Sequence, residues 1–314
     1  MSLRYALAVD LGGTKIEAAL VDPAGALLPG SRFREPTGRA SSSAQLAASA
    51  ETVVLAALAT LPADAELVGV GIGAAGPISV ADGRVSPLNL PGWRDYPLRA
   101  QVADLITGVP VVLRMDGECI ALAEHWVGAA RGERNLMGMV VSTGIGGGLI
   151  VDGRVIAGPT GNAGHIGHVE VGGFSEACLC GGTGCVEAVA SGPHTVDWAR
   201  AQGWTGSTGE ELAEAYAAGD SIAIAAVTRS GTAIGQAIAS ATALLDLDVV
   251  AIGGGFSHVT PDLFGIVEAA IAKRAPFPFV AKVRVIPSGL SGEGPLIGAA
   301  GLIHRAELLG AHGN

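Results

Sequence analysis

Apolar runs typical of buried strands recur along this chain, and each leads into a turn rich in glycine. Residues 5–10 form one such run, and residues 16–21 form another directly after the turn. We expect this pair to be a β-hairpin. Residues 139–143 and 149–152 repeat the same arrangement around a second glycine turn. The hydrophobic pattern therefore predicts a duplicated chain.

Each expected hairpin is followed by helical periodicity and then by a further apolar strand. These later strands cover residues 67–73 and 249–255, and both end in small residues. Helix-like spacing of apolar residues is found at 43–61, 118–130, 193–202, 209–218, 222–245 and 295–309. Strands that alternate with helices predict an α/β protein with mixed sheets.

The length of 314 residues favours two lobes, since a domain averages about 150 residues. A strand at 109–113 passes through Asp116 into the next helix, and we place the lobe boundary there. We expect residues 1–116, together with the closing helix at about 295–314, to form a small N-terminal lobe. Residues 117–294 should form the large lobe.

Charge and composition exclude several classes of protein. The formal net charge is −10, whereas binding to nucleic acid needs clustered Lys and Arg that displace phosphate counterions. No uninterrupted apolar run reaches the ~18 residues of a spanning helix. The N-terminus also lacks the basic region and long apolar stretch of a signal peptide. We expect neither nucleic acid nor a membrane as a partner, and we expect a cytoplasmic location.

The two glycine turns are candidate phosphate sites. Glycine allows backbone N–H groups to converge on an anion without a Cβ in the way, and threonine hydroxyls add donors. An ordinary hairpin turn is the alternative at each place, but a matched pair in duplicated halves favours phosphate. The residues concerned are Gly12, Gly13 and Thr14 in the first turn, and Thr143, Gly144 and Gly146 in the second.

Two further features would complete a nucleotide site. Asp10 precedes the first turn and could hold Mg²⁺ through water, since this ion prefers carboxylate oxygens and retains waters. Gly253, Gly254 and Gly255 end a strand and would let a purine or ribose lie close to the backbone. A plain strand-to-helix turn is the alternative for these three glycines.

Asp116 is the candidate catalytic base. It stands just beyond a strand, where α/β sheets present reactive groups in a crevice. A carboxylate there can take the proton of an attacking hydroxyl in phosphoryl transfer. The alternative is an N-cap for the following helix, a position that Asp favours. Glu118 suits solvent exposure or the helix start better than catalysis.

Four potential metal ligands lie within 18 residues, and they are His168, Cys178, Cys180 and Cys185. Three thiolates and one imidazole form a closed four-ligand set, which is typical of structural zinc. His165 is a rival ligand, but four ligands are already present. We therefore expect zinc on the first four residues and His165 free to face a substrate.

Together these motifs resemble the ROK family of repressors, open reading frames and kinases, and the resemblance runs nearly end to end. The matching segments are 10–15, Asn89-Leu-Pro-Gly-Trp93, 142–148, Gly-His-x-Gly-His168 and 178–187. The resemblance implies a duplicated actin/hexokinase-like (ribonuclease H-like) two-lobed fold. It also implies transfer of the γ-phosphoryl group of ATP, or of polyphosphate, onto a sugar, and it implies a homodimer.

The resemblance also assigns roles to individual residues. It implies that Asp116 abstracts the proton, that Glu187 contacts the sugar, and that Asn89 lies near the sugar. His168 would ligate zinc and also reach a sugar hydroxyl. Lys15 belongs to the phosphate-binding motif.

Two departures bear on the substrate. Glucose-type members have Asn-Asp at the catalytic step and Glu at the first zinc-loop position, whereas this chain has Met115 before Asp116, and His165. The His-Ile-Gly-His sequence is similar to that of N-acetylmannosamine kinases in the family. An apolar thioether at position 115 should tolerate an acyl group or a missing hydroxyl better than an amide does.

We therefore predict an ATP-dependent kinase that phosphorylates the primary (C6) hydroxyl of a hexose or N-acetylhexosamine, of glucose or N-acetylmannosamine type. Its cofactors would be structural Zn²⁺ and Mg²⁺ with ATP. The alternative is a ROK-type sugar-binding regulator or sensor with weak or no kinase activity. A regulator would carry a helix-turn-helix ahead of the first turn, whereas only nine residues precede Asp10.

Overall fold

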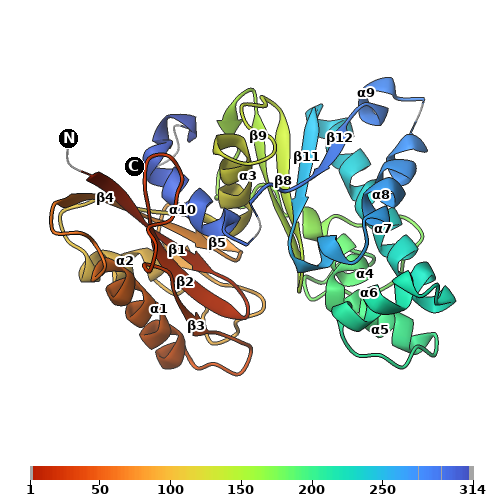
Figure 1. Ribbon diagram of the computed structural model, residues 1–314, viewed down its shortest axis with the longest axis horizontal. Coiled ribbons are helices and arrows are strands. Elements are labelled where there is room, and N and C mark those ends of the chain that lie inside the picture. The colour runs from red at the N-terminus through yellow and green to blue at the C-terminus, as the bar shows by residue number, and fades with distance from the viewer. Residues whose placement is uncertain (1–2, 275, 291, 311–314) are drawn as a thin grey trace.

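Two five-stranded sheets stand side by side in the computed structural model, which describes residues 3–274, 276–290 and 292–310 (Figure 1). The first sheet has the order β3 (Phe33–Pro36), β2 (Lys15–Val21), β1 (Leu3–Leu11), β4 (Ala65–Ala74), β7 (Val111–Met115). The second has the order β10 (Arg154–Val155), β9 (Ile145–Val151), β8 (Leu136–Val141), β11 (Val249–Gly253), β12 (Arg284–Pro287).

The two sheets have the same strand directions as well as the same order. In each sheet the first two strands in sequence form an antiparallel hairpin, and the strands that follow the helices pair in parallel. The hairpins are tight, because Leu11 pairs with Ile16 and Val141 pairs with Ile145. The duplication and both hairpins predicted from the sequence are confirmed.

The first core lies between the first sheet and the helices α1 (Ser43–Leu58) and α2 (Leu98–Leu105). Helix α1 begins with a capping box, in which Ser42 and Gln45 satisfy each other's backbone N–H groups. Its buried residues, such as Leu46, Ala50 and Val53, recur at helical spacing and face the apolar side of the sheet. A small hairpin of β5 (Ile78–Ser79) and β6 (Arg84–Val85) extends this half of the molecule.

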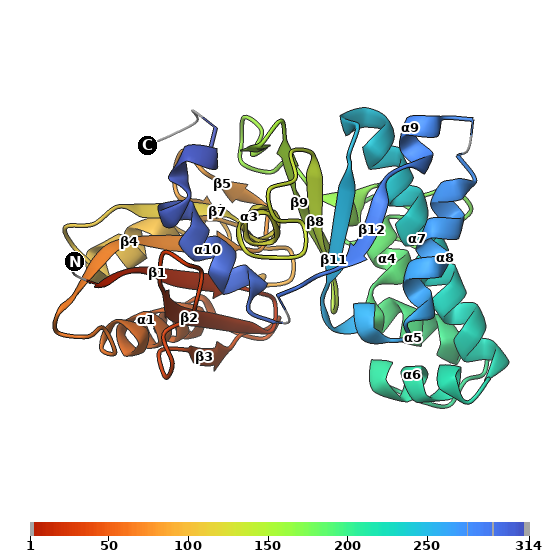
Figure 2. The ribbon, with the colours of Figure 1, turned by 45° about the horizontal axis from the view of Figure 1, so that its top comes forward.

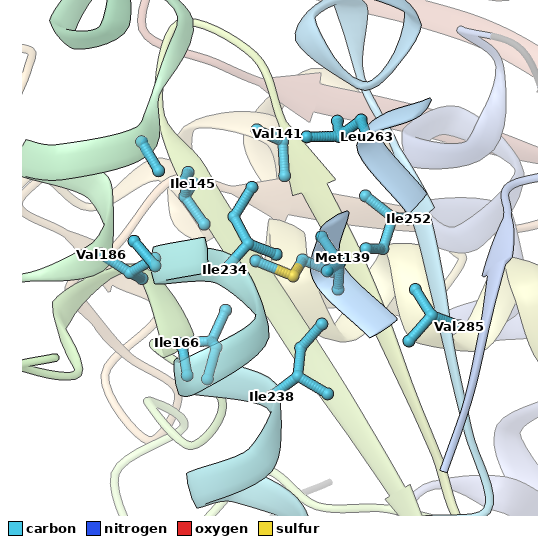
Figure 3. Close-up of a cluster of buried hydrophobic side chains, with 14 of the residues drawn as sticks. Met139, Val141, Ile145, Ile166, Val186, Ile234, Ile238, Ile252, Leu263 and Val285 are labelled. Atoms are coloured by element: carbon cyan, nitrogen blue, oxygen red, sulfur yellow. The ribbon is translucent and has the colours of Figure 1, made fainter. Parts of the chain in front are cut away.

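The second core is larger and packs the second sheet against a layer of helices. Figure 3 shows Met139 and Val141 of the sheet meeting Ile234 and Ile238 of the long central helix. The helices are α4 (Val186–Ala190), α5 (Gly192–Ala201), α6 (Gly209–Ala217), α7 (Ser221–Leu245), α8 (Asp262–Ala272) and α9 (Pro278–Ala281).

Among the described residues, α7 is the one helix with the length and apolar composition to cross a membrane. Most of it is buried in the protein, where it contacts α4, α5, α6 and α8. A core helix of a globular protein has the same length and composition, so this finding is weak evidence for a membrane.

Two helices, α3 (Asp116–Trp126) and α10 (Gly294–His304), lie between the sheets (Figures 1 and 2). Helix α3 packs on β8 and β9, α10 packs on β1 and β4, and the two helices pack on each other. Glycine permits this close approach, because a Cβ on Gly298 would overlap the backbone of Cys119. The closing helix therefore returns to the first sheet.

The predicted division into residues 1–116 with about 295–314, and residues 117–294, stays a prediction. A buried cluster around α3 and α10 joins residues of both sheets. Residues 311–314 of the predicted small lobe lie outside the described residues. Helices α2, α4, α8 and α9 were not expected from the sequence; α2 buries only Leu98 and Val102, which is too few for a clear apolar face.

Candidate functional site

Asp116 is the first residue of α3, at the point where the chain leaves the first sheet and reaches the second. Helix α3 begins directly on the backbone of β9, because a Cβ on Gly117 would overlap Gly147 and a Cβ on Gly148 would overlap Gly117. Three glycines thus bring the carboxylate up to the second hairpin. The packing places Asp116 between the two phosphate-turn candidates.

The N-cap alternative for Asp116 is not what the structure shows. The N-cap residue is Met115, which makes no side-chain cap bond within the described part of the chain. One Asp116 oxygen accepts the N–H of Gly117 at 2.7 Å. Burial raises the pKa of Asp116 to about 6; the Gly117 N–H lowers this pKa and the charge of Glu187 raises it. The group is ionised at neutral pH and is close to a catalytic range.

Asp10 ends the first strand beside the first glycine turn and is 7% exposed. Burial, with the charges of Asp116 and Glu17, raises the pKa of Asp10 to about 7. A cation next to a carboxylate with a raised pKa stabilises its ionised form. Its position suits the predicted Mg²⁺ contact, because the donor set is oxygen and the first turn follows at once.

A cluster of cations beside Asp10 was missed from the sequence. Glu17 pairs with Asp10 across the hairpin and is almost fully buried. Lys15 and Arg32 each donate to Glu17 at 2.7 Å, and Arg34 also forms an ion pair with it. Lys15, predicted to bind phosphate, is therefore held on Glu17 at the edge of the turn. Strand alternation in β2 was the available signal, since residues 15 and 17 share a face.

The second and third glycine turns lie together. A Cβ on Gly254 would lie 2.5 Å from the carbonyl oxygen of Val141, which ends β8, and Gly254 has a φ of 94° that suits glycine. Gly255 faces the hydroxyl of Ser142. Thr143 is exposed beside them. Parallel pairing of β8 and β11 explains the meeting, because both strands end at the same edge.

Each predicted sugar-site side chain lies against a glycine. A Cβ on Gly13 would lie 2.8 Å from Cγ of Asn89, and one on Gly144 would lie 2.7 Å from Oε2 of Glu187. The same glutamate oxygen accepts the N–H of Ile145 at 2.8 Å.

His165 follows the same pattern, since a Cβ on Gly76 would lie 2.7 Å from its Cε1. Burial, with His168 nearby, lowers the pKa of His165, so the ring is neutral at pH 7. Glu187 is also close enough to Asp116 for its charge to raise the pKa of that carboxyl.

The four predicted metal ligands converge. Their ligand atoms all lie within 4.8 Å of one another. Nδ1 of His168 lies 3.5 Å from Sγ of Cys178, and the sulfurs of Cys180 and Cys185 lie 3.6 Å apart. Tetrahedral zinc with Zn–S bonds of about 2.3 Å requires separations of this size. The Cys₃His donor set therefore fits zinc, and Nε2 of His168 stays available on the other side of the ring.

The zinc-loop candidate is anchored to the rest of the second half by Arg229 of α7. Its guanidinium pairs with Glu176 and lies 5.0 Å from the ring centre of Phe174 and 5.4 Å from that of Trp198. It also donates to the carbonyl of Val189 in α4. Arg229 thus joins the loop to the short helix that carries Glu187.

Two side chains are more buried than the sequence suggested. Glu118, expected in solvent or at the helix start, lies in the first turn of α3 but is fully buried and faces Arg114 at 3.6 Å. Helix α3 packs against both sheets, which leaves this position no solvent. Met115, whose thioether was expected to tolerate an acyl group or a missing hydroxyl, is 2% exposed in the first core. Its sulfur and the ring of His165 both lie near Gly76.

Trp93 holds its loop in place. Its ring is 1% exposed and stacks on Tyr96 at 4.1 Å, while its indole N–H donates to the carbonyl of Ser43. The stacking fixes the segment that presents Asn89.

A family model of the ROK family matches residues 6–306, which is nearly all of the chain. The chain belongs to the ROK family. It is 36% identical over 311 residues to an N-acetylmannosamine kinase of Yersinia pseudotuberculosis serotype O:3 (strain YPIII), covering 96% of this chain and 99% of that protein. The family predicted from the sequence is confirmed.

Solved structures of ROK proteins share the fold. A ROK family glucokinase of Streptomyces griseus, in complex with glucose and AMPPNP, has a TM-score of 0.80 at 27% identity, covering 96% of this chain and 99% of that one. A ROK hexokinase of Thermus thermophilus has a TM-score of 0.78 at 33% identity, with the same coverage. The duplicated two-lobed α/β fold is confirmed.

This ROK protein also has a cavity that sequence reasoning missed. It has a volume of about 470 Å³ and adjoins the second and third glycine turns. The starts of α5 and α6 form its other walls. Its lining includes Thr143, Pro193, Thr208, Gly255 and Phe256. The starts of α5 and α6 can be recognised in the sequence, but only the tertiary fold brings them next to the glycine turns.

Proposed function

We propose that this ROK protein transfers the γ-phosphoryl group of ATP to the primary C6 hydroxyl of a hexose or N-acetylhexosamine, with N-acetylmannosamine as the first candidate. The protein is a carbohydrate kinase. The observation that carries the assignment is the position of Asp116, an ionised and half-buried carboxylate where α3 meets β9. The two glycine turns lie on either side of it.

Asp116 acts as the general base. The sugar hydroxyl loses its proton to the Asp116 carboxylate as the oxygen attacks phosphorus, and the bond to the β-phosphate oxygen breaks. Phosphoryl transfer needs little covalent help, so positioning and charge neutralisation contribute most of the rate. Asn89, His165 and Glu187 hold the sugar against this base.

The donor lies along the glycine turns. Gly13 and Thr14 on one side, with Thr143, Gly144 and Gly146 on the other, would direct backbone N–H and hydroxyl groups toward the phosphates, while the N–H of Gly12 closes the first turn on the carbonyl of Lys15 at 2.9 Å. The cavity beside Gly253, Gly254 and Gly255 is large enough for the nucleoside. Asp10 would hold Mg²⁺ beside the first turn, and this ion would supply charge neutralisation to the triphosphate.

His168, Cys178, Cys180 and Cys185 hold a structural zinc ion. With these four residues as its ligands, the metal would order the loop and would leave no place for an activated water. The ordered loop presents His165, and its last residues lead into α4 with Glu187.

The choice of sugar can be tested with purified protein and four acceptors: glucose, mannose, N-acetylglucosamine and N-acetylmannosamine. The 36% identical relative named N-acetylmannosamine kinase and the His165-Ile-Gly-His168 sequence favour N-acetylmannosamine. We expect its kcat/KM to exceed that of glucose by at least about tenfold, the size of one differential contact. Sugar phosphate formed with ATP and with polyphosphate also decides the donor, because transfer from polyphosphate releases no ADP. A preference for glucose would contradict the choice of acceptor.

The rate should depend on the ionisation of Asp116. Its pKa of about 6 means that the base is protonated, and inactive, below that pH. We expect kcat/KM for the sugar to fall about tenfold per pH unit below pH 6 and to level off above it. Saturating magnesium and ATP keep Asp10 ionised, which removes the titration of Asp10 from this profile. A flat profile down to about pH 5 would remove Asp116 as the base.

A sugar-binding sensor without catalysis is the second candidate, because Met115 and His165 replace residues of the glucose-type pattern. Direct sugar binding without ADP release on the whole panel would favour it. We also propose that the protein forms a homodimer, which sedimentation can test. A cytoplasmic location is a further proposal, which cell fractionation can test.

A further inference from the structure

The presence of glycine in the two candidate phosphate turns has a second structural reason besides phosphate binding. Within the described chain, Gly12, Gly13, Gly144 and Gly146 are absent from the set of glycines with positive φ. Their backbone is therefore open to any L-residue, and only space near the Cα decides whether a side chain fits. That space differs sharply between the members of each turn.

The first turn shows the difference clearly. A Cβ on Gly13 would overlap the side-chain amide of Asn89, and all three of its nearest described neighbours are atoms of that one side chain. A Cβ on Gly12 would meet only the carbonyl oxygen of Lys15 at 3.4 Å, which is ordinary contact. Two adjacent glycines thus have different partners.

The second turn repeats the pattern. A Cβ on Gly144 would lie 2.7 Å from Oε2 and 3.5 Å from Cδ of Glu187. That oxygen is already held by the N–H of Ile145. A Cβ on Gly146 would meet no described atom within 4 Å.

We propose that Gly13 and Gly144 are positioning residues of the acceptor site, each kept free of a side chain so that Asn89 or Glu187 can lie directly on a phosphate turn. This inference rests on the proposed function, because it takes both side chains to bind the sugar. Because Asn89 and Glu187 each contact a phosphate turn, they fix the position of the sugar relative to the γ-phosphate. Each half of the duplicated fold supplies one such contact between the sugar site and the phosphate site.

The test compares alanine at neighbouring glycines. Gly13→Ala and Gly144→Ala displace the flexible ends of Asn89 and Glu187 and no backbone, so both variants should fold. We expect the KM for N-acetylmannosamine to rise about tenfold in Gly13→Ala and about 10–100-fold in Gly144→Ala, where the lost contact is charged. The KM for ATP should change less. Gly12→Ala and Gly146→Ala, whose Cβ atoms would reach neither Asn89 nor Glu187, should instead act mainly on the KM for ATP.

A double-mutant cycle tests whether Gly13→Ala acts on the sugar KM through Asn89. Asn89→Ala alone should raise the sugar KM, and adding Gly13→Ala to it should then change the sugar KM no further, because the Cβ has lost the side chain it displaces. Additive effects, or an effect of Gly13→Ala on the ATP KM alone, would overturn the inference. Thermal melting and zinc content check that each variant keeps its fold.

Calorimetry with N-acetylmannosamine and with glucose distinguishes a failure of the proposed function from a failure of this inference. Absence of sugar binding to the wild-type protein would overturn the proposed function and this inference with it. Wild-type binding with an unchanged affinity in Gly13→Ala and Gly144→Ala would overturn the inference and leave the proposed function standing.

Discussion

Replacing Asp116 with asparagine should lower kcat by about 10²–10⁴-fold, the usual contribution of a general base. Asparagine has nearly the same shape and can still face the Gly117 N–H, so the start of α3 and the sugar site should persist. The KM for the sugar should therefore change little, and calorimetry should still detect sugar binding. Steady-state ADP release with saturating magnesium and ATP measures kcat.

The matched control is Asp104→Asn in α2, where the carboxylate is exposed and far from the glycine turns in sequence. It should keep the wild-type kcat. Asp116→Ala should be as inactive as Asp116→Asn, because both lack a proton acceptor. An Asp116→Asn enzyme with an undiminished kcat would show that another group takes the proton, and the assignment would fall.

Loss of the metal should have the second large effect. Cys185 is fully buried and ends the zinc loop one residue before α4. Cys185→Ser should lower zinc affinity by more than about 100-fold, since even residues outside the ligand set change it 10–100-fold. The protein should be isolated without zinc, with a lower melting temperature and a sugar KM too high to saturate. Metal analysis by mass spectrometry, with ADP release, measures both.

A buried thiol outside the cluster provides the control. Cys119→Ala in α3 should retain one zinc per chain and near-normal kinetics, because its sulfur belongs to the packing around Gly73. A strong chelator should inactivate the wild-type protein, and added zinc should restore it. Full activity of a Cys185→Ser protein that contains no zinc would show that the loop needs no metal.

The hairpins, the duplication and the metal ligands could be predicted because each depends on residues close together in sequence. An apolar run next to a glycine turn specifies a hairpin locally, and Cys178, Cys180 and Cys185 are near enough to meet around one ion whatever the remaining fold. The proposed acceptor side chains Asn89 and Glu187 required the family resemblance, since no local pattern distinguishes them from other polar loop residues.

The positions of Glu118 and Met115 depended on neighbours that the sequence does not place. Helix α3 is covered by β9 on one side and α10 on the other, so Glu118 is buried although its place at a helix start suggests exposure. The nucleotide-sized cavity escaped prediction for the same reason, because its walls come from four segments far apart in the chain.

By itself, the sequence determined both hairpins, the duplicated order of elements, the cluster of potential metal ligands and the family, because periodicity and motif spacing act over short distances. The tertiary structure alone decided which side chains touch across the two halves. It placed Asp116 between the two hairpins, Lys15 on Glu17, and Asn89 and Glu187 on Gly13 and Gly144. Such contacts depend on where separate elements pack against one another. In a closely packed protein, the volume of a single methyl group decides whether a contact can form.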